Sequence, residues 1–136
     1  MRVNLRQLTA KDVFHVILPV ADRMVSFELD GGKEDRRYTG LTQVNGKMAD
    51  ATPGSLHGKQ VQDSDPHDLQ VTVRLDGANA TITTTLDGGP LYEWTGPTAA
   101  LSQHADWATT EPGTLSLGTF AGRWMVSEVK VKRLGK

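Results

Sequence analysis

Residues 63–68 hold the densest group of chemically versatile side chains, with three aspartates around one histidine. Alternating aspartates can present oxygens to a hard cation, so Asp63 and Asp65 are candidate ligands of a structural calcium ion. The glycine and terminal glutamate of an EF-hand loop are missing, however, and no second histidine lies near His67 to complete a zinc site. We therefore favour a turn that enters a hairpin, with His67 and Asp68 as a local pair, and expect no other cofactor.

Acid–base chemistry would need carboxylates elsewhere. Glu28 and Asp30 are two residues apart in a predicted strand, which places them on one face, as a paired acid and nucleophile require. Asp30 directly precedes a glycine pair, and no third acid follows at the same spacing, so a turn residue is the favoured interpretation. Glu93 shares strand parity with Leu91, which predicts an inward carboxyl group with a raised pKa. Glu93 is thus the one candidate catalytic residue, although no second acid is tied to it.

Aromatic side chains beside polar ones form a third kind of candidate site. Sugar rings stack their apolar faces on aromatic rings, while their hydroxyls need amide, carboxylate or guanidinium partners. Tyr92 and Trp94 share one face of a predicted strand, opposite Leu91, and each could instead belong to the core. The remaining ligand-binding candidates are Trp107 with Gln103 and Asp106 in a polar loop, and Trp124 with Arg123 at a strand start. Trp107 is the tryptophan that we expect to be exposed.

The element that must position several of these residues is the stretch 67–96. Three strand-like runs are separated there by Asp76-Gly77 and Asp87-Gly88, which supply the positive-φ positions of tight reversals. Apolar and polar residues alternate in the first run, and the second is rich in β-branched residues. We predict an antiparallel meander whose core residues are Leu69, Val71, Val73, Leu75, Ile82, Leu86 and Leu91.

The rest of the chain is also read as short strands joined by turns. Further strands are expected at 2–8, 13–18, 24–29, 41–44, 59–61, 114–120 and 124–134, with a short helical turn within 97–104. The strand 13–18 is apolar on both faces except for His15, so it should be central, and Pro19 should end it. His15 is interpreted as a hydrogen-bonded histidine within the sheet. Asn45-Gly46 is a type I′ hairpin signal.

The last strand carries a change of parity. Trp124 and Val126 share one face, whereas Val129 and Val131 share the other. This predicts a β-bulge near Ser127-Glu128, because one extra residue exchanges the two faces.

Composition sets the class and excludes several functions. The 136 residues include 14 glycines and 6 prolines, and no window shows a helical apolar stripe, so we expect a single all-β domain, 1–136, built as an antiparallel β-sandwich of about ten strands. The net charge of −1 leaves no electrostatic footprint for nucleic acid or an anionic membrane. No apolar run approaches the roughly 18 residues of a membrane span. The N-terminus lacks the apolar region of a signal peptide, so the chain is either cytoplasmic or excised from a larger multidomain protein.

Three phrases carry a family likeness: residues 57–61, residues 86–96 and the ending 129–134. From Val13 onward the sequence resembles the concanavalin A-like lectin and glucanase β-sandwiches, or jelly rolls, and is most similar to laminin-G-like and 3-keto-disaccharide-hydrolase-like bacterial modules. The resemblance implies a jelly-roll fold, and glycoside cleavage as the reaction to consider for an enzyme. One departure is that such domains usually have an additional strand before the first one here.

Three functional hypotheses follow. The leading one is a non-catalytic carbohydrate-binding module that takes a polysaccharide or oligosaccharide, which would place the protein outside the cell or in the periplasm. The second is a glycoside-cleaving enzyme that uses Glu93. The third is a structural or protein-interaction module within a longer chain.

Overall fold

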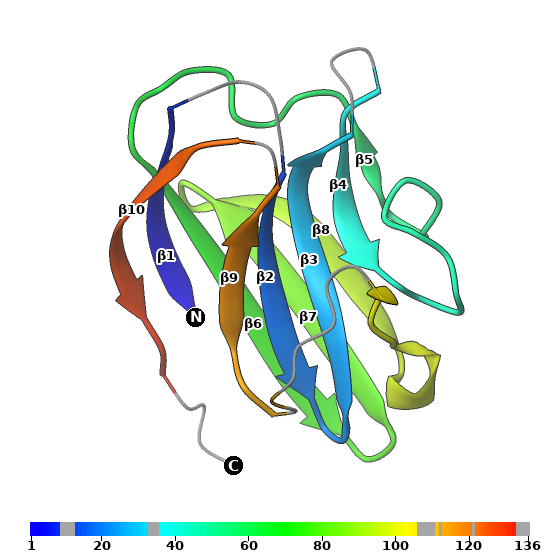
Figure 1. Ribbon diagram of the computed structural model, residues 1–136. Coiled ribbons are helices and arrows are strands. Elements are labelled where there is room, and N and C mark those ends of the chain that lie inside the picture. The colour runs from blue at the N-terminus through cyan, green and yellow to red at the C-terminus, as the bar shows by residue number, and fades with distance from the viewer. Residues whose placement is uncertain (9–12, 33–35, 106–110, 112, 121, 133–136) are drawn as a thin grey trace.

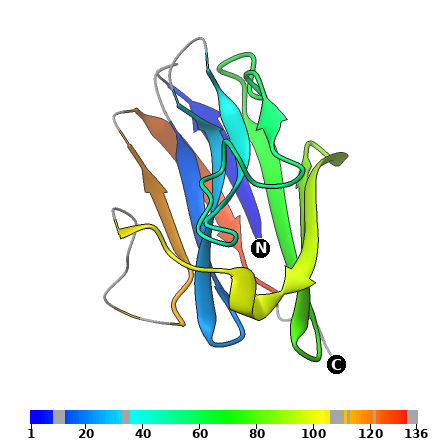
Figure 2. The ribbon, with the colours of Figure 1, turned by 90° about the vertical axis from the view of Figure 1, so that its right-hand side faces the viewer.

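Two five-stranded antiparallel sheets form a sandwich in the computed structural model, which describes residues 1–8, 13–32, 36–105, 111, 113–120 and 122–132 (Figure 1). The first sheet has the order β10 (Trp124–Lys130), β1 (Arg2–Gln7), β6 (His67–Asp76), β7 (Asn79–Leu86) and β8 (Gly89–Pro97). The second has the order β5 (Leu56–His57), β4 (Tyr38–Thr42), β3 (Arg23–Gly31), β2 (Phe14–Val20) and β9 (Ser116–Thr119). Figure 2 shows the two layers edge-on. The predicted all-β sandwich of about ten strands is confirmed.

The short 3₁₀ helix η1 (Thr98–Ala100) lies where a helical turn was expected. No helix of these described residues has the length and hydrophobicity needed to cross a membrane.

The core lies between the sheets and is built mainly from β2 and β3. Phe14 and Phe27 are almost fully buried, together with Leu5 and Leu69 from the first sheet. Each such side chain contributes about 1.5–3 kcal/mol relative to an exposed position. Because β2 lies between β3 and β9, its prediction as a central strand is confirmed.

Several strand boundaries of the second sheet differ from the prediction; β4, for example, is Tyr38–Thr42 rather than 41–44. β2 continues through Pro19 to Val20, because β9 pairs with β2 only as far as Ile17. Beyond that point β2 has a free edge within the described structure, where a residue without an amide hydrogen is tolerated. The strand expected at 59–61 does not form, and β5 lies just before it at Leu56–His57.

The predicted meander is confirmed as β6, β7 and β8. Gly77, Asp87 and Gly88 have the expected positive φ angles of 58°, 51° and 82°. Of the predicted core residues, Leu69, Val71 and Ile82 are buried, while Val73, Leu86 and Leu91 pack against the core as partly buried side chains. Leu75 is 57% exposed, so its prediction as a core residue is wrong.

The face assignment in β8 is also wrong. Thr84 pairs with Tyr92 but Thr85 pairs with Pro90, so Leu91 is the extra residue of a bulge. A bulge exchanges the two faces of the residues that follow it. Tyr92 and Trp94 therefore face the core, at 4% and 7% exposure, whereas Glu93 faces solvent.

The bulge predicted in the last strand is present. Asn4 pairs with Glu128 and Leu5 pairs with Val126, which leaves Ser127 as the extra residue of β10. β10 ends at Lys130, earlier than predicted, and residues 133–134 of the predicted strand lie outside the described residues.

Candidate functional site

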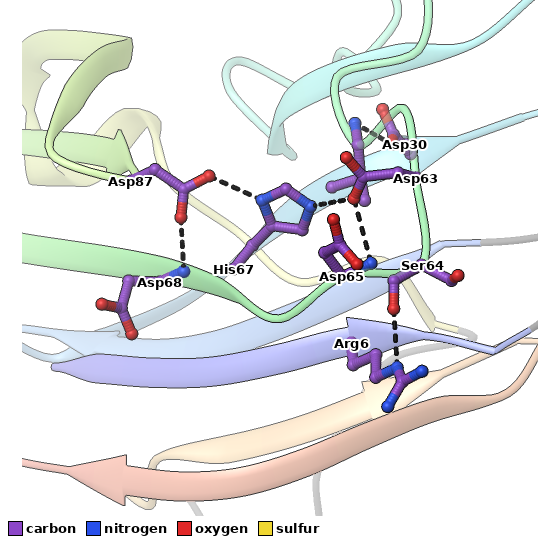
Figure 3. A network of polar contacts seen from close by, with 9 residues as sticks. Arg6, Asp30, Asp63, Ser64, Asp65, His67, Asp68 and Asp87 are labelled. Carbon is purple, nitrogen blue, oxygen red and sulfur yellow. Dashed lines mark hydrogen bonds and ion pairs between the residues drawn. The ribbon is translucent and has the colours of Figure 1, made fainter.

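The most connected polar group in the described structure surrounds His67 at the start of β6 (Figure 3). The ring atom Nδ1 lies 2.6 Å from Oδ2 of Asp87, and Nε2 lies 2.7 Å from Oδ1 of Asp63. Asp87 comes from the β7–β8 turn, and its other oxygen accepts the Asp68 amide at 2.9 Å. Asp63 also accepts the amide of Asp65 at 3.0 Å. A single imidazole thus joins a hairpin turn to the loop before β6, which confirms the predicted turn.

Electrostatics favour the charged imidazolium in this group. The hydrogen bond with Asp87 raises the pKa of His67, burial opposes it, and the hydrogen bond with Asp63 raises the pKa further. The hydrogen bond with His67 in turn lowers the pKa of Asp63. Burial opposes a lower pKa at Asp87, but its hydrogen bonds with His67 and the Asp68 amide prevail and lower it.

This group is poorly suited to proton transfer or metal binding. Both ring nitrogens of His67 are held by carboxylates, so neither lies open to a substrate. The calcium alternative meets the same difficulty, since one Asp63 oxygen already accepts two hydrogen bonds. Among the residues that the structure describes, no three His, Asp or Glu side chains group in a way that could hold a metal ion.

The predicted local pair of His67 with Asp68 is wrong. Asp68 instead accepts hydrogen bonds from Arg2 at 2.7 Å and from Asn4 at 3.1 Å, across the β1–β6 pair. Arg6 donates to the carbonyl of Ser64 at 2.6 Å (Figure 3). These contacts fasten β1 and the 58–66 loop to β6.

The two carboxylates of β3 are structural anchors in the same region. Asp30 accepts the backbone amides of Gln60 at 2.6 Å and Val61 at 2.9 Å, which holds residues 59–61 as a loop whose Val61 side chain is buried. Burial raises the pKa of Asp30, and these two hydrogen bonds oppose the rise. Glu28 is buried and accepts a hydrogen bond from Thr42 at 3.0 Å. The interpretation of Asp30 as a turn residue is wrong: it lies inside β3, where the pairing with β4 shifts register between Glu28 and Gly31, and its φ of 54° belongs to this irregularity.

The aromatic candidates divide into buried and exposed rings. Tyr92 and Trp94 are core residues: the Tyr92 ring lies 6.0 Å from that of Phe27, and its hydroxyl donates to the Pro53 carbonyl at 3.1 Å. Neither ring is open for stacking on a sugar. Glu93 is exposed and has no apolar enclosure, so the prediction that it faces inward is wrong.

Only one member of the predicted group Gln103, Asp106 and Trp107 lies among the described residues. Gln103 is half-buried, whereas Trp107 and Asp106 lie outside the described residues. The prediction that Trp107 is exposed therefore stays a prediction.

Trp124 and Arg123, the last predicted pair, lie at the surface where β1 ends and β10 begins. Trp124 is half-buried, pairs with Gln7 and packs against Phe14, with ring centroids 5.5 Å apart. The exposed Arg123 accepts the Leu8 amide through its carbonyl at 2.9 Å.

Phe120 precedes Arg123 by three residues in the sequence and lies at the same end of the sandwich, at the end of β9. Its amide donates to Val13, the neighbour of Phe14, at 3.4 Å, and its side chain is 59% exposed. We call Leu8, Phe120, Arg123 and Trp124 the aromatic end. Leu8 adds a further apolar side chain that is 48% exposed.

Gln7 adds an unusual polar group beneath this surface. Its side chain is buried, and its Nε2 atom has no hydrogen-bond partner among the residues that the structure describes. Leaving a buried donor unsatisfied costs about 1–3 kcal/mol of stability. This donor lies directly beside the aromatic end, because Gln7 pairs with Trp124 across the β1–β10 strand pair.

Several of these features were missed at the level of sequence. The sequence predicts Asp87 only as a turn residue, although the meander register, which pairs Leu69 with Leu86, places it opposite Asp68 and beside His67. The burial of Gln7 did have a signal, because it shares strand parity with the buried Val3 and Leu5, whereas nothing in the sequence indicated that Phe120 is exposed.

Protein-family models, curated proteins and solved structures were all compared with the chain, and none matches it.

Proposed function

We propose that this protein is a non-catalytic carbohydrate-binding module that holds a polysaccharide or oligosaccharide at its aromatic end. The observation that carries the proposal is the combination of an exposed phenylalanine, a half-buried tryptophan and an exposed arginine at one end of the sandwich. The resemblance to concanavalin A-like modules supports the same ligand class and is part of the proposal.

The chemistry of this end suits a sugar. The rings of Phe120 and Trp124 offer apolar surfaces on which the C–H face of a pyranose can stack. The guanidinium of Arg123 can donate several hydrogen bonds in one plane to neighbouring hydroxyls. Trp124 is supported by Phe14, so little conformational entropy is lost when a ligand stacks on it.

The same structure argues against the enzyme hypothesis. A glycosidase needs two carboxyl groups that face the substrate from opposite sides. Glu93 is exposed and pairs with Thr83, while Glu28 and Asp30 accept hydrogen bonds inside the fold. Asp63 and Asp87 are committed to His67.

The proposal is tested by the retention of the protein on a panel of polysaccharides and oligosaccharides. Because Phe120 is exposed, Phe120→Ala should leave stability nearly unchanged and weaken binding at least tenfold. Trp124→Ala should weaken binding similarly, and Arg123→Ala should weaken it a few-fold, through the loss of hydrogen bonds to hydroxyls. Leu75→Ala is the matched control, since Leu75 is equally exposed but lies on β6, away from the aromatic end.

Binding that persists unchanged in both aromatic variants would contradict the proposed site. Failure of the wild-type protein to bind any glycan of the panel would contradict the function itself.

A further inference from the structure

The exposed turn at Asn45-Gly46 follows β4 along the chain. Both residues have positive φ angles, of 50° and 74°, as the predicted type I′ turn requires. Val44 and Lys47 close the turn with reciprocal backbone hydrogen bonds of 3.1 and 2.9 Å. Among the described residues, no atom beyond its chain neighbours lies within 4 Å of the position that a Cβ atom of Gly46 would occupy. The tip of the turn is therefore open to water.

An exposed Asn-Gly pair carries the groups for a reaction with itself. The glycine amide gives its proton to hydroxide, and its nitrogen then attacks Cγ of the asparagine. A new C–N bond closes a five-membered succinimide, while the old Cγ–N bond breaks and the side-chain nitrogen leaves as ammonia with a proton taken from water. Water then opens the ring at either carbonyl, which produces aspartate or isoaspartate. Glycine permits the ring closure because it has no Cβ atom to obstruct it.

The structure singles out Asn45 among residues that could react in this way. Of the three asparagines, it alone precedes a glycine, whereas Asn4 and Asn79 lie in strands β1 and β7. Asp30 and Asp87 also precede glycines, but both oxygens of each carboxylate are hydrogen-bonded. A carboxylate also resists attack by a nucleophile, because it is already negatively charged.

The turn also holds the segment that follows β8. The amide of Asn45 donates to the carbonyl of Ala100 at 2.8 Å. Gln43 and Ser102 exchange backbone hydrogen bonds of 3.0 and 3.1 Å, and the Ser102 hydroxyl donates to Oε1 of Gln43 at 3.0 Å. Between these contacts, Leu101 is fully buried. Residues 43–47 thus anchor residues 98–102, which we call the η1 segment.

The two products of the reaction differ in their effect on this anchor. Isoaspartate carries the main chain through its Cβ and Cγ atoms, which adds one atom to the turn. A type I′ loop has two residues of fixed length, so Val44 and Lys47 cannot both keep their hydrogen bonds across a longer turn. Aspartate keeps the ordinary main chain and tolerates a positive φ. It therefore adds only a negative charge.

We propose that Asn45 is a modification site, at which the protein deamidates without an enzyme, and that the isoaspartyl product releases the η1 segment from residues 43–47. The modification acts through the geometry of the main chain, and its charge is secondary. The proposal does not rest on carbohydrate binding, because the turn shares no residue with the aromatic end. Each can fail without the other.

Peptide mass spectrometry of the folded protein, incubated at pH 9 and in parallel at pH 5, measures the reaction. Asn45 should deamidate at least tenfold faster at pH 9, because the attacking nitrogen must lose its proton, and at least tenfold faster than Asn4 or Asn79 in the same sample. Methyl transfer by an isoaspartyl carboxyl methyltransferase counts the isoaspartate formed. Asn45→Gln should remove the signal, since its longer side chain would have to close a six-membered ring.

Hydrogen exchange of the separated isoaspartyl form measures the structural consequence. The amides of Gln43, Val44 and Ser102 should exchange at least tenfold faster than in the unmodified protein, while those of β7 stay unchanged. Asn45→Asp is the matched control, because it adds the charge without the extra main-chain atom, and it should keep the protection. Deamidation of Asn45 no faster than that of Asn79, an isoaspartyl form with unaltered exchange, or an equal loss of protection in Asn45→Asp would each overturn the proposal.

Discussion

At the scale of single residues, His67 shows how sequence neighbours can mislead. The sequence alone identifies the acidic segment 63–68, and the prediction that it forms a turn before the hairpin is confirmed. The partner of His67 on the far side, Asp87, lies 20 residues away and becomes its neighbour only through the meander. Asp68, adjacent in sequence, instead points to Arg2 and Asn4, because successive side chains in a strand face opposite sides.

This arrangement predicts a pH-dependent contribution to stability. The pKa of His67 is raised, so its contribution is complete below the ordinary histidine value of 6.5 and is lost as pH rises through the higher folded value. The pKa values of Asp63 and Asp87 are lowered, so their contribution is present above 3.8 and is lost as pH falls through the folded values. The network should stabilise the fold most between these limits.

Urea unfolding of the wild type and of His67→Gln at pH 5 and pH 9 measures the effect. The variant should be less stable by about 1 kcal/mol at pH 5, and the difference should shrink at pH 9. His57→Gln, at an exposed histidine, serves as the control. Identical pH profiles for His67→Gln and the wild type would show that the network contributes nothing.

At the scale of elements, two β-bulges decide which side chains face the core. The bulge at Ser127 could be predicted, because the apolar parity visibly changes within one strand. The bulge at Leu91 could not, because an uninterrupted alternation places Leu91 inward and only the pairing of Ile82 with Trp94 reveals the shift. The extra residue Leu91 turns Tyr92 and Trp94 into the core, so neither can bind a ligand at the surface, and it turns Glu93 out of the apolar environment expected for a catalytic acid.

The contact between β2 and β9 offers a test of packing at the same scale. Gly118 lies opposite His15, and a Cβ atom at position 118 would lie 2.1 Å from Nε2 of that ring. His15 is itself buried, and burial lowers its pKa. Gly118→Ala should therefore destabilise the protein by about 1–3 kcal/mol through overpacking.

Thermal or urea unfolding compares this variant with Ser116→Ala, which lies opposite Ile17 in the same strand pair and should change stability little. Adding His15→Ala to Gly118→Ala should recover part of the loss, since the pair is coupled by direct contact. A Gly118→Ala protein as stable as Ser116→Ala would refute the close packing of β9 on β2.

At the scale of the whole molecule, the fold class, the meander and its turns could be predicted, because they depend on local alternation and turn chemistry. The site could be predicted only in part: Trp124 and Arg123 lie at the surface, but Tyr92 and Trp94 do not. The features that the sequence does not predict depend on contacts between segments that are far apart in the chain. The anchoring of residues 60–61 by Asp30, 30 residues away in the sequence, and the exposure of Leu75 both depend on how distant segments pack in the folded chain.

The central claim, that a glycan binds at the aromatic end, is tested most directly by a ¹H–¹⁵N correlation spectrum of the wild-type protein, titrated with the best-retained oligosaccharide. We predict saturable shifts of the Trp124 indole N–H and of the Phe120 and Arg123 amides, with the Val73 and Leu75 amides unchanged. Saturable shifts confined to other residues, or none with any retained glycan, would contradict the account.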